Sequence, residues 1–370
     1  MKQSKFSHAA VLLASAMVLL VLPSCRKAAD KVAPKEQAAP SSEADQALMK
    51  QAGGIFQPVP AVAGRKDNPV TPEKVALGKM LYYEPRLSES SWISCNSCHN
   101  LALYGVDNLP TSLGNQWHHG PRNAPTVLNA AFQIAQFWDG RAADVEEQAK
   151  GPMLNPIEMA SPHADFAVER IASIPEYHAL FKKAFPGQDN PVTFNNITDA
   201  IGAFERTLMT ESRFDKFLKG DASALTDQEK AGLKTFIDKG CVQCHTGPGV
   251  GGAMFQKFGV YKPYAEATGS KKIDYGRYQE TKKEADKFYF KVPTLRNIAH
   301  TYPYFHDGSV WSLDKAVHVM ADVQLNKTLS DQEAAEIGAF LKSLTGKIPA
   351  DALELPELPP STDETPKPVT

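Results

Sequence analysis

The chain has 370 residues, 42% of them hydrophobic, and its 40 Lys and Arg residues stand against 42 Asp and Glu, which gives a formal net charge of −2. At roughly 150 residues per domain this length suggests two domains, and the hydrophobic content excludes a wholly disordered chain. The near-balance of charge argues against a nucleic-acid-binding protein, which would carry a basic excess. The one long apolar run lies at the N-terminus, so a protein with several membrane spans is excluded as well.

The first 25 residues have the pattern of an export signal. Lys2 and Lys5 precede an apolar run over residues 9–22, whose length is typical of a signal peptide and short for a membrane span. The sequence Leu-Pro-Ser-Cys that ends at Cys25 resembles a lipoprotein box, in which the cysteine carries lipid at the new N-terminus; ordinary cleavage, with Cys25 as a bystander, is the alternative. Both interpretations predict export to the periplasm, and the first adds a lipid anchor to a membrane.

Two further segments have the composition of flexible chain. Residues 26–51 are rich in Ala, Lys, Glu, Pro and Ser, which predicts a flexible tether. Residues 349–370 are rich in Pro, Glu and Thr, which predicts a disordered tail. The folded part is therefore expected to span residues 52–348.

The chain contains five cysteines, and the four that follow Cys25 occur in two copies of the pattern Cys-x-x-Cys-His, namely Cys95, Cys98 and His99, and Cys241, Cys244 and His245. This pattern attaches c-type haem: the two thiols take the two vinyl groups as thioethers, and the adjacent histidine becomes the proximal iron ligand. Two redox dithiols with accidental histidines are one alternative, and a zinc site formed by both pairs is another. Because histidine is rare in this chain, 10 of 370 residues, and the pairs are far apart, we predict two covalently bound haem c groups.

Each motif is flanked by segments with helical signals. Before the second motif, Thr226 and Glu229 have capping-box spacing, and an apolar stripe at helical spacing continues to Gly240. After the motif, the same capping pattern recurs at residues 329–333, and a second stripe is expected to end at Gly346.

The first half repeats this layout. A helix is predicted to begin at residues 71–73, ahead of the first motif, and a closing helix at about Asn196. Long strand patterns are absent, so the fold class is mostly α, with two cytochrome c-like haem domains in tandem. We place the first domain at residues 52–212 and the second at 213–348.

Candidate sixth ligands differ between the two halves. In the second half, Met254 and Met320 lie after the motif, and Met320 is expected near the closing helix, where a cytochrome c methionine falls. Methionine ligation raises the reduction potential of a haem and closes its iron to substrates. In the first half the corresponding stretch, residues 151–159, offers two methionines and Glu158. A carboxyl group beside an open iron could move the proton that peroxide cleavage needs, although an exposed loop residue is the simpler interpretation of Glu158.

From about residue 61 to 346 the chain resembles the bacterial dihaem cytochrome c peroxidases. Besides the haem motifs, the matching stretches are Gly-Pro-Arg-Asn-Ala-Pro-Thr at 120–126, Gln-Phe-Trp-Asp-Gly-Arg-Ala at 136–142, Lys-Val-Pro-Thr-Leu-Arg-Asn at 291–297 and Pro-Tyr-Phe-His-Asp-Gly at 303–308. The resemblance implies that His99 binds the peroxidatic haem, and that His245 and Met320 bind the electron-transfer haem.

The resemblance also implies roles near these haems. Glu158 matches the catalytic carboxylate and Gln148 a glutamine beside the peroxide pocket. Trp138 matches a tryptophan between the haems that would act as an electron bridge; without the resemblance, a core aromatic residue is the simpler interpretation.

A calcium ion between the domains is implied too, held by the Asn123 side chain and by the backbone carbonyls of Thr301 and Pro303. Oxygen ligands of this kind suit calcium, but the sequence contains no independent calcium motif.

One departure from the family pattern concerns the first haem. Many members have Ser-x-Gly-His-x-Trp, whose histidine blocks the peroxidatic iron until the other haem is reduced. Here Asn115 takes the place of that histidine. We therefore expect the iron at His99 to lack the usual lock, with His118 and His119 as loop residues; ligation by either of these two is the alternative.

The expected function is reduction of hydrogen peroxide to water with electrons from a small donor protein, either a cytochrome c or a cupredoxin. Family members often form homodimers, and no nucleic acid is involved. A dihaem electron carrier without catalysis is one alternative. A dihaem oxidase that modifies another protein is a second, but such relatives have tyrosine at the axial position that Met320 occupies here.

Overall fold

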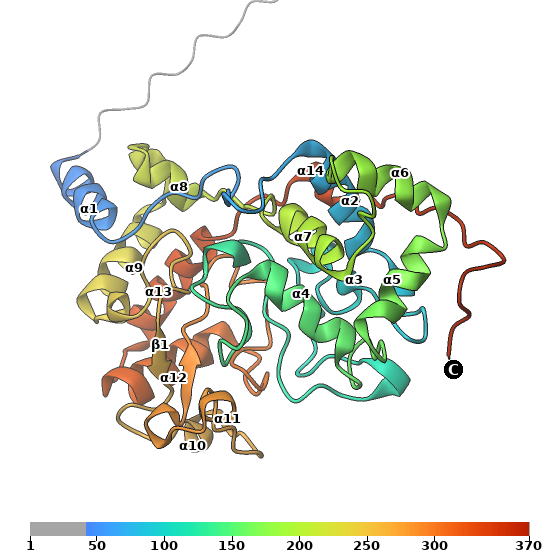
Figure 1. The fold of residues 1–370 in the computed structure, drawn as a ribbon. Coiled ribbons are helices and arrows are strands. Elements are labelled where there is room, and N and C mark those ends of the chain that lie inside the picture. Colours follow the sequence, from blue (N-terminus) through green and yellow to red (C-terminus); the bar gives the residue numbers. More distant parts are fainter. Residues whose placement is uncertain (1–41, 370) are drawn as a thin grey trace, which may run out of the picture. The chain divides into compact units, whose positions relative to one another are not determined.

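The computed structural model describes residues 42–369 (Figure 1). The predicted export signal with Cys25, and the tether as far as residue 41, lie outside the described residues. The helices are α1 Glu43–Gly53, α2 Pro72–Tyr82, α3 Cys95–Cys98, α4 Val145–Leu154, α5 Ala164–Ala172, α6 Pro175–Ala184, α7 Phe194–Glu205, α8 Arg213–Leu218, α9 Asp227–Asp238, α10 Tyr264–Thr268, α11 Tyr278–Thr281, α12 Leu313–Leu325, α13 Asp331–Ser343 and α14 Ala350–Leu353. Strands β1 Phe255–Lys257 and β2 Tyr289–Lys291 form an antiparallel pair in which Phe255 is opposite Lys291.

The mostly helical fold is confirmed, and the capping residues begin the helices as predicted. Thr71 accepts a hydrogen bond from the Lys74 amide at the start of α2. Thr226 and Ser330 form capping boxes at the starts of α9 and α13. Gly240, just beyond α9, has φ +90°, a conformation that glycine adopts without steric cost.

The two halves are built around the same kind of helix pair. In the first half α2 packs on α7, and a Cβ at Gly78 would overlap the carbonyl of Ala200. In the second half α9 packs on α13, and a Cβ at Gly232 would overlap the carbonyl of Glu336. A glycine thus lets two helices approach closely in each half, which supports the predicted internal duplication.

Gly346 does not end a helix, contrary to the prediction, because α13 stops at Ser343. Its backbone instead runs against Thr210, where a Cβ would meet the Thr210 carbonyl. The glycine therefore allows a close approach between the ends of the two halves.

Residues 43–51 form most of α1 and are not a tether, contrary to the prediction. Ser42 caps the helix by accepting from the Asp45 amide, and Asp45 pairs with Lys230 of α9 at 2.8 Å. Ala52 and Phe56 then enter the core of the second half, where the Phe56 and Phe214 rings lie 5.3 Å apart. The Ala, Lys and Glu content that suggested flexible chain suits a helix equally well.

The C-terminal segment is also ordered, contrary to the prediction. Ile348 and Ala352 belong to the core of the first half, and α14 lies beside α2 (Figure 1). Further on, Thr365 is buried and accepts a hydrogen bond from Ser173 at 2.9 Å. A proline-rich backbone has few N–H donors but keeps its carbonyls, and side-chain donors of the first half bind them.

Each terminal segment therefore packs into the half that is farther from it in the sequence. The N-terminal residues 43–56 complete the core of the second half, and residues 348–352 complete that of the first. The predicted boundaries at 52, 212 and 348 follow chain order and miss this exchange.

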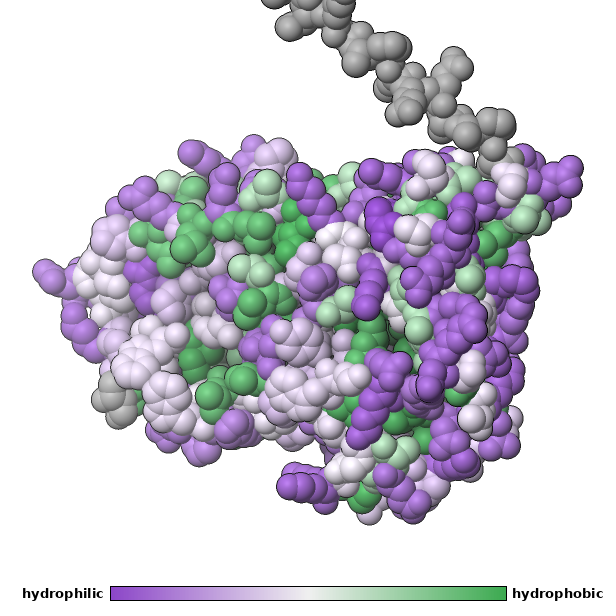
Figure 2. Space-filling view, turned by 180° about the vertical axis from the view of Figure 1, so that it is seen from behind, coloured by the Kyte–Doolittle hydropathy of each residue, from purple (hydrophilic) through white to green (hydrophobic). Residues whose placement is uncertain are grey.

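The surface is mixed in character. On the face shown in Figure 2, hydrophobic side chains form patches among hydrophilic ones, as expected for a chain of balanced charge. Among the described residues, no helix is both long enough and apolar enough to cross a membrane.

Candidate active site

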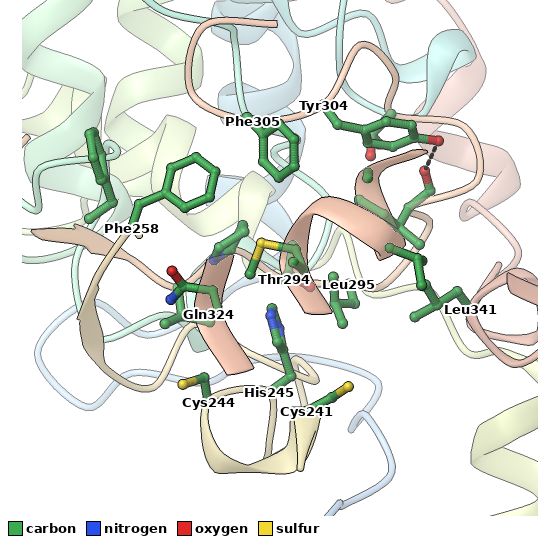
Figure 3. A pocket seen from close by; sticks show the side chains of 18 of the residues that line it. Cys241, Cys244, His245, Phe258, Thr294, Leu295, Tyr304, Phe305, Gln324 and Leu341 are labelled. Atoms are coloured by element: carbon green, nitrogen blue, oxygen red, sulfur yellow. Dashed lines mark hydrogen bonds between the residues drawn. The ribbon is translucent and has the colours of Figure 1, made fainter. Parts of the chain in front are cut away.

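The second motif lies at the wall of a large cavity. Cys241 begins a short 3-10 turn, Cys241–Gln243, that follows directly on Gly240. In Figure 3 the His245 ring points away from this turn into the cavity, and the Cys241 and Cys244 sulfurs lie on either side of it. The cavity encloses about 220 Å³ and has a mostly apolar lining that includes Phe236, Leu295 and Leu341. This arrangement fits a flat apolar macrocycle that is bound through two thiols and one imidazole.

The His245 imidazole is neutral and has one ring nitrogen available to bind a metal. Burial lowers the pKa of His245 to about 4, so the imidazole carries no proton on one nitrogen at neutral pH. Its Nδ1 lies 3.4 Å from the carbonyl oxygen of Val250. A backbone carbonyl at Nδ1 fixes the ring and leaves Nε2 for the metal.

Met320 lines the same cavity as His245. It lies within α12, after the motif and ahead of the closing helix α13, as predicted. Met254, the other candidate, is not among the lining residues. The second site therefore brings together one histidine and one methionine, the ligand set of an electron-transfer haem c.

The first motif lies at a smaller cavity, which it shares with two predicted catalytic residues. Cys95, Cys98 and His99 line it together with Gln148 of α4 and Glu158, from the loop that follows α4. Burial lowers the pKa of His99, which again favours the neutral ring. The donor set fits a second haem c.

Glu158 is held by a neighbouring amide and has a perturbed acidity. Asn155 Nδ2 donates to Glu158 Oε1 at 2.7 Å. Burial raises the pKa of the Glu158 carboxyl, and the charge of Arg141 and the Asn155 hydrogen bond only partly offset this. A carboxyl with a raised pKa can hold a proton closer to neutral pH, which suits acid–base chemistry.

Glu205 is a residue of this cavity that the sequence analysis missed. It is the last residue of α7, is buried, and lines the first cavity with Cys95. Burial and the nearby Glu146 charge raise the pKa of Glu205 to about 8. Its position four residues after Ile201, on the apolar stripe of α7, is the signal that could have identified it.

Trp138 and the predicted calcium ligands line the second cavity. The Trp138 indole donates to the Asn123 carbonyl at 2.9 Å, and Lys291 donates its amide to the Trp138 carbonyl at 2.8 Å. Asn123, Thr301 and Pro303 are among the residues that line the same cavity. The structure thus brings the three predicted calcium ligands and Trp138 into one region.

The loop that carries Asn115 packs against Glu158. Asn115 is buried, its amide donates to the Glu158 carbonyl at 2.7 Å, and its side chain donates to Glu89 at 2.9 Å. His118 and His119 are exposed and bind within their own loop, through the Asn115 carbonyl and the Thr111 hydroxyl. Neither histidine is among the residues that line the first cavity.

The zinc alternative finds no support in the structure. Within residues 42–369, no group of three or more His, Cys, Asp or Glu side chains is placed to hold a metal ion. The two motifs therefore serve two separate cavities, each with its own histidine.

Two haem-binding motifs in a duplicated helical fold, one of them in a cavity that a methionine also lines, define a dihaem c-type cytochrome. Family models agree: "Di-haem cytochrome c peroxidase" matches residues 72–223 and "Cytochrome c" matches residues 229–345. The chain is 52% identical to the cytochrome c551 peroxidase of Nitrosomonas europaea over 84% of this chain and 90% of that protein. It is 48% identical to the cytochrome c551 peroxidase of Pseudomonas aeruginosa over 90% of this chain and 95% of that protein. The chain belongs to the di-haem cytochrome c peroxidase family.

A solved structure supports the fold assignment. A MauG-like protein associated with microbial copper homeostasis superimposes with a TM-score of 0.71 at 29% identity, over 80% of this chain and 97% of that one. The two haem c groups and the tandem arrangement predicted from the sequence are confirmed by the two family models.

Proposed function

We propose that this chain reduces hydrogen peroxide to two waters at the first haem site, using two protons and two electrons that arrive through the second site. The observation that carries the proposal is the pairing of Glu158 and Gln148 with His99 in one cavity, while Met320 accompanies His245 in the other. The peroxidase names of relatives at 52% and 48% identity support it.

At the first site, the chain supplies proton transfer and positioning. A haem c held by Cys95, Cys98 and His99 would supply the iron that binds peroxide and exchanges electrons with it. Cleavage of the O–O bond requires a proton to leave one peroxide oxygen and reach the other, and a single carboxyl within hydrogen-bond reach can perform both transfers. Glu158 takes this role, and the Gln148 amide orients the peroxide by hydrogen bonding.

At the second site, the chain stores and passes electrons. Ligation by His245 and Met320 gives a high reduction potential and keeps substrates from the iron. Trp138, which lines this cavity, is the proposed bridge toward the first site. A small cytochrome c or a cupredoxin returns the electrons one at a time.

Met159 is the methionine of the first cavity, and it must stay off the iron for this function. Its side chain is buried in the core of the first half. The proposal therefore has Met159 as a packing residue, with the cavity side of the iron left to peroxide, Glu158 and Gln148.

Glu158→Gln tests the proposal because glutamine keeps the shape and cannot exchange a proton as a carboxyl does. Loss of a general acid–base should lower kcat by roughly 100- to 10,000-fold, with haem content and optical spectra unchanged. Glu147→Gln, at an exposed position of the same part of the chain, is the matched control and should turn over normally. Unchanged peroxide turnover in Glu158→Gln would instead favour a dihaem electron carrier.

Three further features belong to the same proposal. A calcium ion binds the Asn123 side-chain oxygen and the Thr301 and Pro303 carbonyls, and Asn123→Ala should lower the calcium measured per chain. The protein is exported to the periplasm, with Cys25 lipidated or removed, which mass spectrometry of the mature chain decides. It assembles as a homodimer, as sedimentation of the holoprotein would show.

A further inference from the structure

We propose that Glu89 is a positioning residue of the first haem site. It holds the Asn115 loop, residues 112–119, against the loop that carries Glu158. The C-terminal segment 361–369 binds the backbone of Glu89 and keeps it in place. The activity arm of this inference rests on the peroxidase function proposed above, whereas its spectroscopic arm does not.

Glu89 joins three segments that are far apart in the chain. Its amide donates to the carbonyl of Met159, next to Glu158, at 2.8 Å. Its carboxylate accepts from the Asn115 side chain at 2.9 Å. Its carbonyl accepts from the Val369 amide at 3.1 Å. One half-buried residue thus contacts the Asn115 loop, the loop that carries Glu158, and Val369, the last described residue of the chain.

The Asn115 loop and the loop that carries Glu158 are themselves in close contact. The Asn115 amide donates to the Glu158 carbonyl at 2.7 Å. A Cβ at Gly114 would overlap the carbonyl of Ile157, so the backbones leave no space between them. A displacement of the Asn115 loop must therefore disturb the Glu158 backbone.

The Asn115 loop does not adopt this conformation by local preference. Gln116 has φ +51° and Trp117 has φ +63°, and left-handed conformations of this kind are strained in residues other than glycine. Trp117 is 72% exposed, so burial of its ring contributes little to holding it. The hydrogen bonds of Asn115 to Glu158 and Glu89 offset this strain, together with an edge contact between the Trp117 and Trp92 rings at 6.4 Å.

Arg170 fastens the other side of Glu89. Its guanidinium is fully buried and donates to the Glu89 carbonyl at 2.9 Å and to the Lys367 carbonyl at 2.8 Å. It also donates to the Ser88 carbonyl and to the Ser91 hydroxyl. The C-terminal segment is thereby tied to residues 88–91, which lead directly into the first haem motif.

Reversing the polarity of the Asn115–Glu89 hydrogen bond gives a sharp test. Asn115→Asp places a second carboxylate against Glu89, whereas the double variant Asn115→Asp with Glu89→Gln restores a donor and an acceptor in exchanged positions. Gln116→Glu adds the same charge to an exposed position of the same loop and is the control. A chain that stops after Pro360 removes the C-terminal contacts and leaves α14 in place.

The measurements are EPR of the fully oxidised holoprotein and steady-state peroxide kinetics. We expect Asn115→Asp and the shortened chain to show an additional EPR species of the first haem, with the second haem unchanged, and a kcat about tenfold lower. The double variant and Gln116→Glu should match the unmodified protein. Wild-type EPR in Asn115→Asp and in the shortened chain, or failure of the double variant to restore the single signal, would overturn the inference. If the unmodified holoprotein does not reduce peroxide, the proposed function fails, while the EPR comparison still decides the role of Glu89.

Discussion

Asp215→Ala should be among the most destabilising single changes in this chain. The Asp215 and Arg296 side chains are both 0% exposed, and they form two hydrogen bonds, of 2.8 and 2.9 Å. Asp215 also accepts from the backbone amides of Val59 at 2.9 Å and Ser212 at 2.7 Å. Removal of the carboxylate leaves a buried guanidinium and two amides without their acceptor.

The cost follows from the loss of that buried partner. Breaking a buried pair by removing one member costs about 3–5 kcal/mol. With an unfolding entropy of about 2.1 cal/mol/K per residue, a chain of 370 residues has roughly 0.8 kcal/mol/K in total, so the melting temperature of the holoprotein should fall by about 4–6 °C. Arg296 also donates to the Pro248 carbonyl, in the loop that carries Val250, so the absorption of the second haem should change on heating before that of the first.

The pair also makes stability depend on pH in a defined direction. Burial alone would raise the pKa of Asp215, but the Arg296 charge and the Ser212 hydrogen bonds outweigh it and leave the pKa lowered. A group with a lowered folded pKa contributes stability above its unfolded pKa, near 3.9, and loses it as the pH falls. Thermal melting of the unmodified protein and of Asp215→Ala between pH 3 and 7 measures this pH dependence of stability. Glu211→Ala, at an exposed neighbouring position, is the control. If Asp215→Ala lowers the free energy of unfolding by less than about 1 kcal/mol, the reasoning from the buried pair is refuted.

Three further predictions concern the haem sites. Met320→Leu should lower the reduction potential of the second haem and open its iron to small ligands, because methionine ligation raises the potential and fills the sixth position; spectroelectrochemistry with added cyanide tests this, and an unchanged potential contradicts it. The pKa of Glu205, raised to about 8, means that its contribution to stability is complete below pH ~4.3 and is lost as the pH rises through about 8. Glu205→Gln should remove that pH dependence from denaturant melts, and a persistent slope would show that another group titrates. If Asn115 takes the place of the blocking histidine, as the family resemblance implies, the fully oxidised protein should react with peroxide in stopped flow without prior reduction, and a bis-histidine EPR signal at the first haem would refute this.

The sequence predicted what depends on local chemistry. The haem motifs need only adjacent residues, and the capping boxes at Thr226 and Ser330 act within one helical turn, so the spacing alone located both features. The joint placement of Gln148 and Glu158 came from family resemblance, because a helix and the loop that follows it reach the same cavity only through the tertiary fold.

What the sequence analysis missed depends on distant partners. The terminal segments were interpreted by composition alone. The ion pair of Asp45 with Lys230 and the hydrogen bond from Arg170 to the Lys367 carbonyl form only in the folded chain. The role of Glu89 likewise has no signal in the residues around it, since its partners come from three separate segments. Glu205 was the exception, because a carboxylate on an apolar helical stripe is visible in the sequence.

The exchange of terminal segments between the halves has a consequence for biosynthesis. As the chain leaves the ribosome, neither half can finish packing by itself: the later half needs the segment made earliest, and the earlier half waits for the segment made last. A gene fragment that encodes either half alone would therefore yield a protein with an open core, however cleanly the cut separates the two haem motifs. Engineering that aims to isolate one haem must transplant the foreign terminal piece along with it.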